Sequence, residues 1–260
     1  MGEWFKEWFD GDYAVIYGHR DGPEAEAAVA MALERSPALA SGPVLDLGCG
    51  AGRHLAALRR RNPLAFGLDL SRDLLALAPP DLRPWLLRGD MRHLPLKPGA
   101  LAGVCLWFTP FGYFSDRDNR ALLRSLAAAL RPGGALVLDY LNAALVRDRL
   151  VPADTATHGS LRVESRRALE GDRLVKRMTI THLDTGRVRR ARESLRLYSA
   201  EELGAMARAC GLRLDGAAGD YHGGPFDRDR SSRWIGFLSR HSDKMKDDSR
   251  GGDHAFQDPA

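Results

Sequence analysis

The stretch Val44-Leu-Asp-Leu-Gly-Cys-Gly-Ala-Gly-Arg-His54 is the strongest indication of fold class in this sequence. In it an apolar run of strand character leads directly into a loop with glycines at Gly48, Gly50 and Gly52. Glycines at alternate positions let the chain turn tightly after a strand, and they let a ligand approach the main chain where a β-carbon would collide. A helix beginning near Arg53 would then offer unpaired N–H groups to the same ligand. The stretch therefore predicts a nucleotide-cofactor loop in an α/β protein.

The spacing of the glycines separates two kinds of cofactor. A dinucleotide-binding loop reads Gly-x-Gly-x-x-Gly, whereas here the third glycine comes one position early and Arg53 stands where that loop needs a small residue. Asp46, two residues before the first glycine, would repel a pyrophosphate but attract an ammonium group. We therefore expect a cofactor that carries an amine. NAD, bound by a dehydrogenase, is the alternative.

Two further acidic residues follow apolar runs. Asp69, with Leu70 beside it, ends the run that begins at residue 65, and a carboxylate there can accept both hydroxyls of a ribose. Asp90 follows a short apolar stretch, and its carboxylate could accept a hydrogen bond from an adenine amino group while Met91 packs on the ring. The three acids together predict a site for an adenosine that also bears an amine.

These motifs, in this order, resemble the class I methyltransferases that use S-adenosylmethionine. The resemblance rests on Asp46-Leu-Gly-Cys-Gly-Ala-Gly52, Asp69, the pair Asp90-Met91 and the segment Leu130-Arg-Pro-Gly-Gly-Ala-Leu-Val-Leu-Asp139. It implies that the glycine loop faces the methionine moiety, that Asp69 binds the ribose and that Asp90 and Met91 contact the adenine. The cofactor-binding residues expected are Tyr17, Arg20, Asp46, Gly48, Cys49, Gly50, Gly52, Asp69, Leu70, Asp90, Met91 and Phe108.

The order of strands and helices agrees with this resemblance. From residue 44 to residue 139 apolar runs alternate with helical segments at the intervals of a parallel sheet covered by helices. Short apolar runs are typical of buried strands, and leucines and alanines at helical spacing lie between them. The strands are expected at 43–47, 65–70, 85–88, 103–108 and 134–140, and the helices at 53–61, 72–78 and 119–130.

After the fifth strand the pattern changes to three runs rich in Arg, Val, Leu and Thr, separated by turn signals. These runs, at 160–169, 173–183 and 188–198, predict an antiparallel meander. Ser199-Ala-Glu-Glu202 then has the form of a capping box, so a helix should begin there and end near Cys210.

Two final strands, at 212–217 and 233–239, would complete a Rossmann-like seven-stranded methyltransferase sheet with helices on both faces and a small antiparallel β insertion. The expected organisation is one class I domain over 1–241, with N-terminal cap helices in 1–40 and an antiparallel β lid insertion in 155–198, followed by a disordered tail at 242–260.

The insertion narrows the resemblance to a branch of small-molecule methyltransferases in which it forms part of a lid over the substrate. The segments that support this are 108–114 with Asp118-Asn119, 139–142, 219–226 and 231–237. This branch implies transfer of a methyl group to an N, O or C nucleophile of a small molecule, and it leaves the acceptor open.

Methyl transfer requires a nucleophile placed in line behind the sulfonium methyl, so positioning should supply most of the rate. Aromatic faces attract a diffuse cation, and Phe108, Phe111 and Tyr113 follow the fourth strand at the sheet edge where open α/β folds bind ligands. Histidine is the usual general base near neutral pH. The catalytic candidates are Tyr17, Tyr113 and His222, and the substrate-contact candidates are Phe111, Tyr113, Tyr140, Asn142 and His222.

The amino-terminal segment 4–21 contains more aromatic side chains than an untethered tail would carry. In the resembling family this segment helps to enclose the sulfonium. Tyr13, Tyr17, His19 and Arg20 are therefore candidates, with Tyr17 and Arg20 as the preferred cofactor contacts.

The net charge is +4, and the meander contains many arginines, which raises an RNA methyltransferase as an alternative. A non-catalytic S-adenosylmethionine-binding regulator is a second alternative. No apolar run approaches the length of a membrane helix, and the start of the chain lacks a signal sequence, so we expect a cytoplasmic protein without a membrane partner, as a monomer or homodimer. The cysteines Cys49, Cys105 and Cys210 have no CxxC spacing, so no disulfide frame and no metal site are expected.

Overall fold

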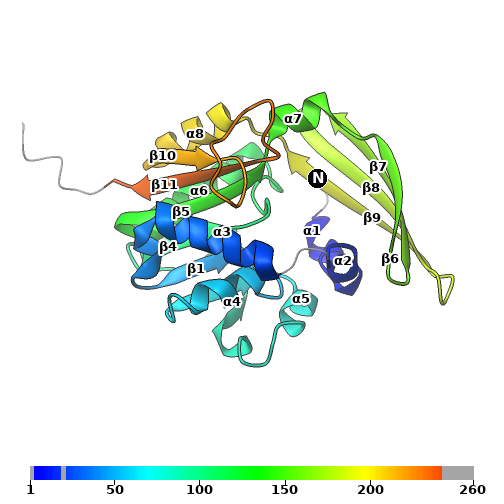
Figure 1. Cartoon of the computed structure of the whole chain (residues 1–260), viewed down its shortest axis with the longest axis horizontal. Coiled ribbons are helices and arrows are strands. Elements are labelled where there is room, and N and C mark those ends of the chain that lie inside the picture. The colour runs from blue at the N-terminus through cyan, green and yellow to red at the C-terminus, as the bar shows by residue number, and fades with distance from the viewer. Residues whose placement is uncertain (1–2, 19–21, 242–260) are drawn as a thin grey trace, which may run out of the picture.

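The computed structural model describes residues 3–18 and 22–241. Its centre is a seven-stranded sheet with the order β10-β11-β5-β4-β1-β2-β3 (Figure 1). Its strands are β1 (Val44–Leu47), β2 (Ala65–Asp69), β3 (Leu86–Arg88), β4 (Leu101–Leu106), β5 (Leu130–Leu141), β10 (Leu212–Ala218) and β11 (Arg233–Arg240). The Rossmann-like methyltransferase fold predicted from the sequence is confirmed.

Helices cover both faces of this sheet because successive side chains of a strand point to opposite faces. In β1, Leu45 and Leu47 join the apolar cluster beneath α6 and α8, whereas Val44 joins the cluster beneath α3 and α4. The helices around the sheet are α3 (Gly22–Arg35), α4 (Arg53–Arg59), α5 (Arg72–Ala76), α6 (Asp116–Ala129), α7 (Ala143–Asp148) and α8 (Ala200–Ala209), with short 3₁₀ turns η1 (Pro37–Ala40) and η2 (Arg83–Trp85).

The parallel strands bring the loops that follow them to one edge of the sheet. Val44 of β1 lies opposite Ala65 of β2 and Gly103 of β4, and these strands run in the same direction. The segments after β1, β2, β3 and β4 therefore meet at the carboxyl edge, where open α/β sheets bind ligands.

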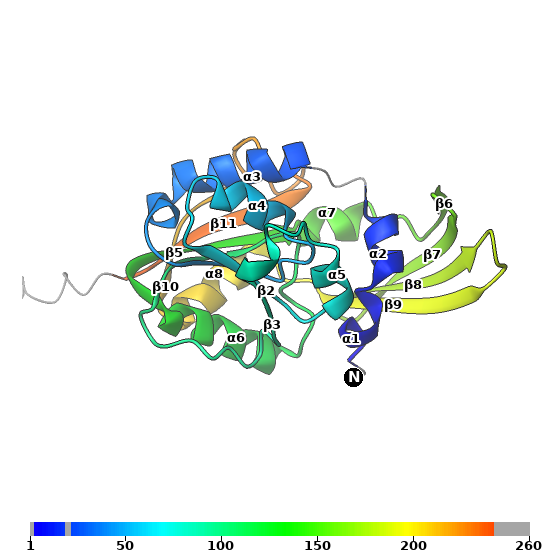
Figure 2. The same ribbon diagram turned by 90° about the horizontal axis from the view of Figure 1, so that it is seen from below.

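A second sheet lies beside this edge, at the right in Figure 1, and its strand order is β6-β7-β8-β9. Two short amino-terminal helices, α1 (Phe5–Trp8) and α2 (Gly11–Ile16), lie between the two sheets, as both ribbon views show (Figures 1 and 2). Trp8 and Ile16 of these helices pack with Val163, Met178 and Ile180 of the second sheet. The strands of the second sheet are β6 (Ala153–His158), β7 (Leu161–Glu170), β8 (Arg173–His182) and β9 (Val188–Arg196).

The structure corrects three of the expected elements. The insertion has a fourth strand, β6, whose polar and largely exposed sequence gave no apolar pattern. Strand β4 ends at Leu106 and not at 108, because Phe108 adopts a positive φ of 65° that a strand does not contain. Helix α6 begins at Asp116 and not at 119, since the Ser115 side chain caps it by accepting a hydrogen bond from the Asp118 N–H.

The capping box at the start of α8 is confirmed: the Ser199 side chain accepts from the backbone of Glu202, and the Glu202 side chain accepts from the backbone of Ser199. The expected tail at 242–260 lies outside the described residues. No helix among the described residues is both long and apolar enough to cross a membrane.

Candidate active site

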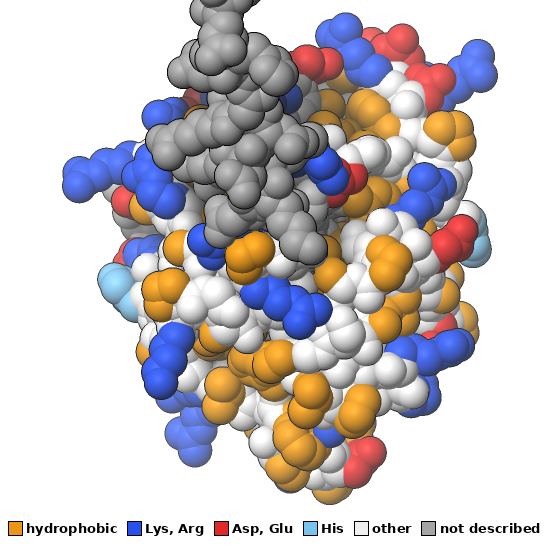
Figure 3. All heavy atoms as spheres, turned by 90° about the vertical axis from the view of Figure 1, so that its left-hand side faces the viewer, with side chains coloured by type: hydrophobic (Ala, Val, Ile, Leu, Met, Phe, Trp, Pro, Cys, Tyr) orange, Lys and Arg blue, Asp and Glu red, His pale blue; other side chains and the backbone are white. Residues whose placement is uncertain are grey.

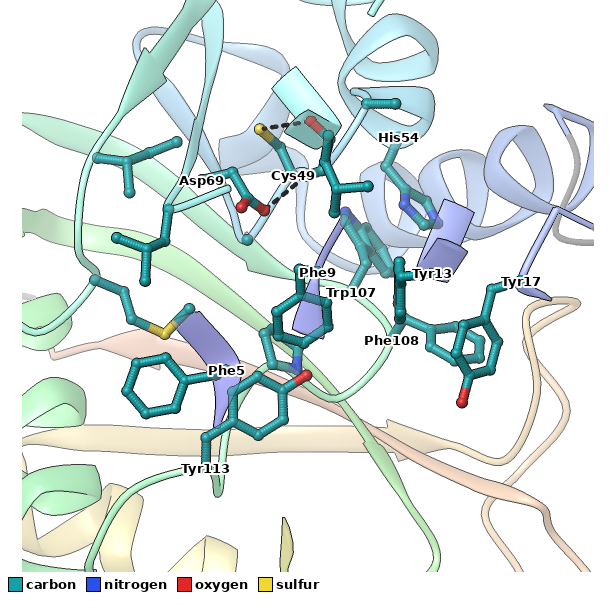
Figure 4. A pocket seen from close by; sticks show the side chains of 18 of the residues that line it. Phe5, Phe9, Tyr13, Tyr17, Cys49, His54, Asp69, Trp107, Phe108 and Tyr113 are labelled. Atoms are coloured by element: carbon teal, nitrogen blue, oxygen red, sulfur yellow. Dashed lines mark hydrogen bonds between the residues drawn. The ribbon is translucent and has the colours of Figure 1, made fainter. Parts of the chain in front are cut away.

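A cavity of about 310 Å³ opens at the carboxyl edge of the seven-stranded sheet, where the loops after β1 to β4 meet α1 and α2. One side is formed by the glycine loop and by the ends of β2 and β3, and the opposite side is formed by aromatic rings (Figure 4). The sequence-predicted cofactor residues that line it are Tyr17, Gly48, Cys49, Gly50, Asp69, Leu70, Asp90, Met91 and Phe108.

The glycine loop has the conformation that its residues allow. Gly48, Gly50 and Gly52 have φ values of +75°, +55° and +82°, a region that residues with a β-carbon rarely adopt. The Gly50 N–H donates to Oδ2 of Asp69 at 2.8 Å, so the loop after β1 is fixed against the end of β2. Gly52 does not line the cavity as expected: it is the residue before α4, and a β-carbon there would lie 2.4 Å from the Leu82 side chain.

The two acids predicted to bind the adenosine line the cavity in different electrostatic settings. Burial raises the pKa of Asp69, although N–H groups of Ser71 and Gly50 stabilise its ionised form. Burial acts in the same direction on Asp90, but the hydrogen bonds from Arg92 outweigh it, so the pKa of Asp90 is lowered. The Arg92 Nε lies 3.0 Å from both carboxylate oxygens of Asp90. Each acid therefore has a fixed orientation at the cavity wall.

Asp46 does not line the cavity, contrary to expectation, because it lies within β1 and its side chain is 1% exposed. Burial, and then the neighbouring charge of Asp69, raises the pKa of Asp46 to about 7. Its Oδ2 is buried without a hydrogen-bond partner among the described residues. A buried carboxyl oxygen without a donor is costly, and a cofactor amine at the adjacent glycine loop would supply one. The site therefore fits an amine-bearing adenosine cofactor.

The aromatic side of the cavity is built mainly by α1, α2 and the segment after β4. The ring centroids of Phe9 and Tyr13 lie 4.9 Å apart and those of Tyr13 and Tyr17 4.7 Å apart. Phe9 also stacks on Tyr113 at 5.8 Å. Figure 4 shows these rings and Phe108 facing the glycine loop and Asp69 across the cavity. A row of ring faces of this kind attracts cationic groups.

A second cavity, of about 320 Å³, adjoins the first on the side of the second sheet. The two cavities share Phe9, Tyr13, Tyr17, Phe108 and Tyr113 in their walls. The second sheet contributes the side chains of Arg167, Leu174, Lys176, Glu193 and Leu195, and the central sheet contributes those of Leu141 and Arg233. A small molecule in the second cavity would therefore lie next to the first cavity, against the aromatic residues that both cavities share.

A buried ion pair fixes the turn that carries Phe108. Phe108 and Thr109 both have positive φ values, 65° and 66°, which cost free energy in residues other than glycine. The Asp139 carboxylate accepts from the Phe108 N–H at 2.6 Å, from the Tyr221 hydroxyl at 2.6 Å and from Arg233. Arg233 also donates to the Thr109 hydroxyl at 2.8 Å, so the network holds both residues in place.

The structure does not bring four of the predicted acceptor contacts to either cavity. Phe111 and Tyr140 are fully buried in the core, and the Tyr140 hydroxyl donates to the backbone oxygen of Arg196. Asn142 caps α7 and donates to the backbone oxygens of Arg228 and Ser231, in the loop before β11. His222 is exposed and lines neither cavity, whereas its neighbour Tyr221 points to Asp139. The pattern near these residues indicated the right loops but not the direction of the side chains.

Several cavity residues were not assigned from the sequence. Trp107, directly before Phe108, and His54, on the first turn of α4, stack at 5.1 Å in the wall of the first cavity. Glu193 and Lys176 line the second cavity, and the sequence around them, an arginine-rich strand pattern, does not indicate a site. Only their place in the chain, next to motif residues, could have indicated Trp107 and His54. Arg20, a predicted cofactor contact, lies outside the described residues.

No group of three or more His, Cys, Asp or Glu side chains that could hold a metal ion occurs within residues 3–18 and 22–241.

Residues 44–134 match a family model described as a methyltransferase domain. The chain is 29% identical over 223 residues to the dTDP-4-amino-2,3,4,6-tetradeoxy-D-glucose N,N-dimethyltransferase of Saccharopolyspora spinosa, a match that covers 80% of this chain and 88% of that enzyme. It is 40% identical over 106 residues to the carboxy-S-adenosyl-L-methionine synthase of Chromohalobacter salexigens, which covers 36% of this chain and 38% of that enzyme.

A solved structure is similar over almost the whole length. It is the S-adenosylmethionine-bound amino pentose methyltransferase from Micromonospora echinaspora, involved in calicheamicin biosynthesis. The TM-score is 0.64, the identity is 25%, and the match covers 90% of this chain and 98% of the other. The family model, the relatives and this structure agree with the fold.

Proposed function

We propose that this chain, a class I S-adenosylmethionine-dependent methyltransferase of small molecules, methylates an amine nitrogen. S-adenosylmethionine supplies an electrophilic methyl group on its sulfonium. What the chain must add is a binding site for the cofactor, a binding site for the acceptor amine and a path between them from which water is excluded.

The first cavity is proposed as the cofactor site. Asp69 would accept the ribose hydroxyls, Asp90 and Met91 would contact the adenine, and the glycine loop with Asp46 behind it would hold the methionine moiety. Support comes from the lining of the cavity and from the unpartnered buried oxygen of Asp46. Tyr17 and Phe108, which line both cavities, would enclose the sulfonium.

The second cavity is proposed as the acceptor site, and its position carries the proposal. It shares five aromatic residues with the first cavity, and its remaining wall comes largely from the second sheet, which would act as a lid. Tyr113 lies in the shared wall and remains a candidate for orienting the acceptor. The relative from Saccharopolyspora spinosa is named for the dimethylation of a nucleotide-linked amino sugar. An amine, which binds as a cation, is the nucleophile that best suits a cavity whose described wall combines aromatic rings with one carboxylate.

The test is a comparison of two acceptors that differ in one atom. The purified protein would be incubated with S-adenosylmethionine and either dTDP-4-amino-2,3,4,6-tetradeoxy-D-glucose or the same nucleotide sugar with a hydroxyl in place of the amine. Mass spectrometry would follow the methylated product. We expect methylation of the amine and none of the hydroxyl compound. Methylation of the hydroxyl compound alone would contradict the proposal.

The RNA alternative receives less support from the surface. Arginines of the second sheet pair with acids, for example Arg167 with Asp154 at 2.7 Å and Arg177 with Glu170 at 2.6 Å. On the face opposite the second sheet, basic side chains are scattered among acidic and apolar ones and do not form one patch (Figure 3). Salt-sensitive binding of RNA would revive this alternative. A cytoplasmic location and a monomeric or homodimeric state stay predictions.

A further inference from the structure

Glu193 is the single carboxylate among the described residues that line the second cavity. It lies in β9, directly opposite Lys176 of β8. The other charged side chains in this wall are Arg167, which is paired with Asp154, and Arg233, which is paired with Asp139. Among the described residues, this wall combines three cationic side chains with one acid, so their negative charge lies at one defined point.

The hydrogen bonds of Glu193 fix the direction of its carboxylate. Its Oε1 accepts from the indole N–H of Trp8 at 2.7 Å and from the hydroxyl of Tyr17 at 3.1 Å. Lys176 donates in turn to the Tyr17 hydroxyl oxygen at 2.9 Å. Both bonds to Glu193 reach the same oxygen, and Oε2 receives none from the described residues. One oxygen is therefore anchored while the other keeps its lone pairs.

These contacts also place Glu193 near the boundary of the two cavities. Tyr17, which donates to Glu193, lines both cavities, whereas Trp8 belongs to α1 and Glu193 to the second sheet. The acid is thus oriented only when the amino-terminal helices pack against the second sheet. Its position therefore depends on contacts between two segments that are far apart in the chain, the amino-terminal segment and β9.

An aliphatic amine is an ammonium ion at neutral pH and has no lone pair to attack with. Before transfer it must bind as a cation and lose one proton. We propose, on the basis of the amine acceptor proposed above, that Glu193 binds the acceptor's ammonium group through Oε2 and removes its proton. Tyr17 and Trp8 act as positioning residues, since they hold Oε1.

One N–H bond of the ammonium breaks and its proton passes to the Glu193 carboxylate. The nitrogen lone pair that remains forms the new N–C bond to the methyl carbon, while the C–S bond breaks and its electron pair stays on the sulfur. The products are the N-methylated acceptor, as an ammonium ion, and S-adenosylhomocysteine. The proton on Glu193 then passes to solvent.

The experiment compares the wild type with Glu193→Gln, which keeps the shape of the side chain but cannot take a proton. Glu164→Gln is the matched control, because Glu164 lies on the same sheet in an exposed ion pair with Arg162 and lines neither cavity. The kcat/KM for dTDP-4-amino-2,3,4,6-tetradeoxy-D-glucose would be measured from pH 6 to 10, and calorimetry would give the affinity for S-adenosylhomocysteine.

At pH 7 the kcat/KM of Glu193→Gln should be about 100-fold below that of the wild type, as expected for a lost proton acceptor. The deficit should shrink as the pH rises and the acceptor loses its own proton. Affinity for S-adenosylhomocysteine should stay unchanged in both variants, which shows that the fold and the first cavity are intact. Glu164→Gln should match the wild type throughout.

Two results would overturn the inference separately from the proposed function. Glu193→Gln with wild-type kcat/KM on the amine at every pH would show that Glu193 neither binds nor deprotonates the acceptor. A deficit that is constant from pH 6 to 10 would restrict it to a structural role. By contrast, a wild-type protein that methylates only the hydroxyl compound would contradict the proposed function, and the present inference would fail with it.

Discussion

Two regions of the molecule, the carboxyl edge of the seven-stranded sheet and the second sheet, are held in place by different kinds of interaction. At the carboxyl edge, glycines with positive φ and hydrogen bonds from the backbone, such as that from Gly50 to Asp69, determine the conformation of the loop within a few residues. The second sheet instead reaches its place through side chains of distant segments, such as Trp8 of α1 bonded to Glu193 of β9.

One wall of the site therefore follows from a short local segment of the chain, whereas the other depends on contacts between segments that are far apart in the sequence. Local backbone geometry suits a cofactor that stays the same when the acceptor differs. Side-chain contacts across a lid can vary without disturbing the central sheet, and loops and lids are where substrate specificity usually resides. Matched substitutions in the two regions test this difference.

The largest effect is expected from the buried ion pair at the end of β5. Asp139 is fully buried and pairs with Arg233, so Asp139→Ala leaves a guanidinium and the Phe108–Thr109 turn without their acceptor. Removing one partner of a buried pair costs about 3–5 kcal/mol. In the second sheet, Asp154→Ala breaks a pair with Arg167 that is partly exposed, which costs at most about 1 kcal/mol. Urea unfolding would measure the loss of unfolding free energy in both variants. Equal losses would contradict the expected difference between the two regions.

A smaller difference is expected between two glycines. Gly52→Ala places a β-carbon at a φ of +82° and against the buried Leu82, whereas Gly171→Ala, at φ +61° in the β7–β8 turn, meets no atom within 4 Å. The left-handed conformation alone costs roughly 1–2 kcal/mol. We expect a loss of about 2 kcal/mol for Gly52→Ala and about 1 kcal/mol for Gly171→Ala in unfolding free energy. Only Gly52→Ala should also weaken binding of S-adenosylhomocysteine.

The third prediction concerns pH. Because the pKa of Asp46 is raised to about 7, its carboxyl is largely protonated below pH 7 in the free protein. A cofactor amine binds better to the ionised form, so binding must release a proton there. Affinity for S-adenosylhomocysteine should therefore fall by up to about tenfold, or about 1.4 kcal/mol, for each pH unit below 7 and level off above 8.

Asp46→Asn should bind more weakly at pH 8 and lose this pH dependence, whereas Glu193→Gln in the second sheet should retain it. Calorimetric titrations at pH 6, 7 and 8 would distinguish the two. An unchanged slope in Asp46→Asn would show that another group titrates.

Most of the central sheet could be predicted from the sequence, because apolar runs, turn signals and the glycine loop are local patterns. The antiparallel insertion was expected too, but β6 was not, since its residues form hydrogen bonds to β7 without an apolar face of their own. The alternation of buried and exposed side chains along β1 follows from strand geometry alone.

The sequence predicted much of the lining of the first cavity but little of the lining of the second. Asp69, Asp90 and the glycines could be predicted from their spacing after apolar runs of the sequence. The burial of Asp46, by contrast, depends on strands β2 and β4 on either side of it. Tyr140 and Asn142 lie at the predicted strand end, yet one packs into the core and the other caps a helix. The sequence around Glu193 does not indicate its place in the second cavity, since its orientation depends on contacts with residues 176 and 185 positions away in the chain.

The first cavity is the proposed binding site of the S-adenosyl cofactor. Calorimetric titration of the wild type with S-adenosylhomocysteine, beside NAD and with Asp69→Ala as a variant, tests it without knowledge of the acceptor. We predict that the wild type binds S-adenosylhomocysteine at one site and does not bind NAD, and that Asp69→Ala loses most of this affinity. A folded wild type that binds NAD but not S-adenosylhomocysteine would contradict the account.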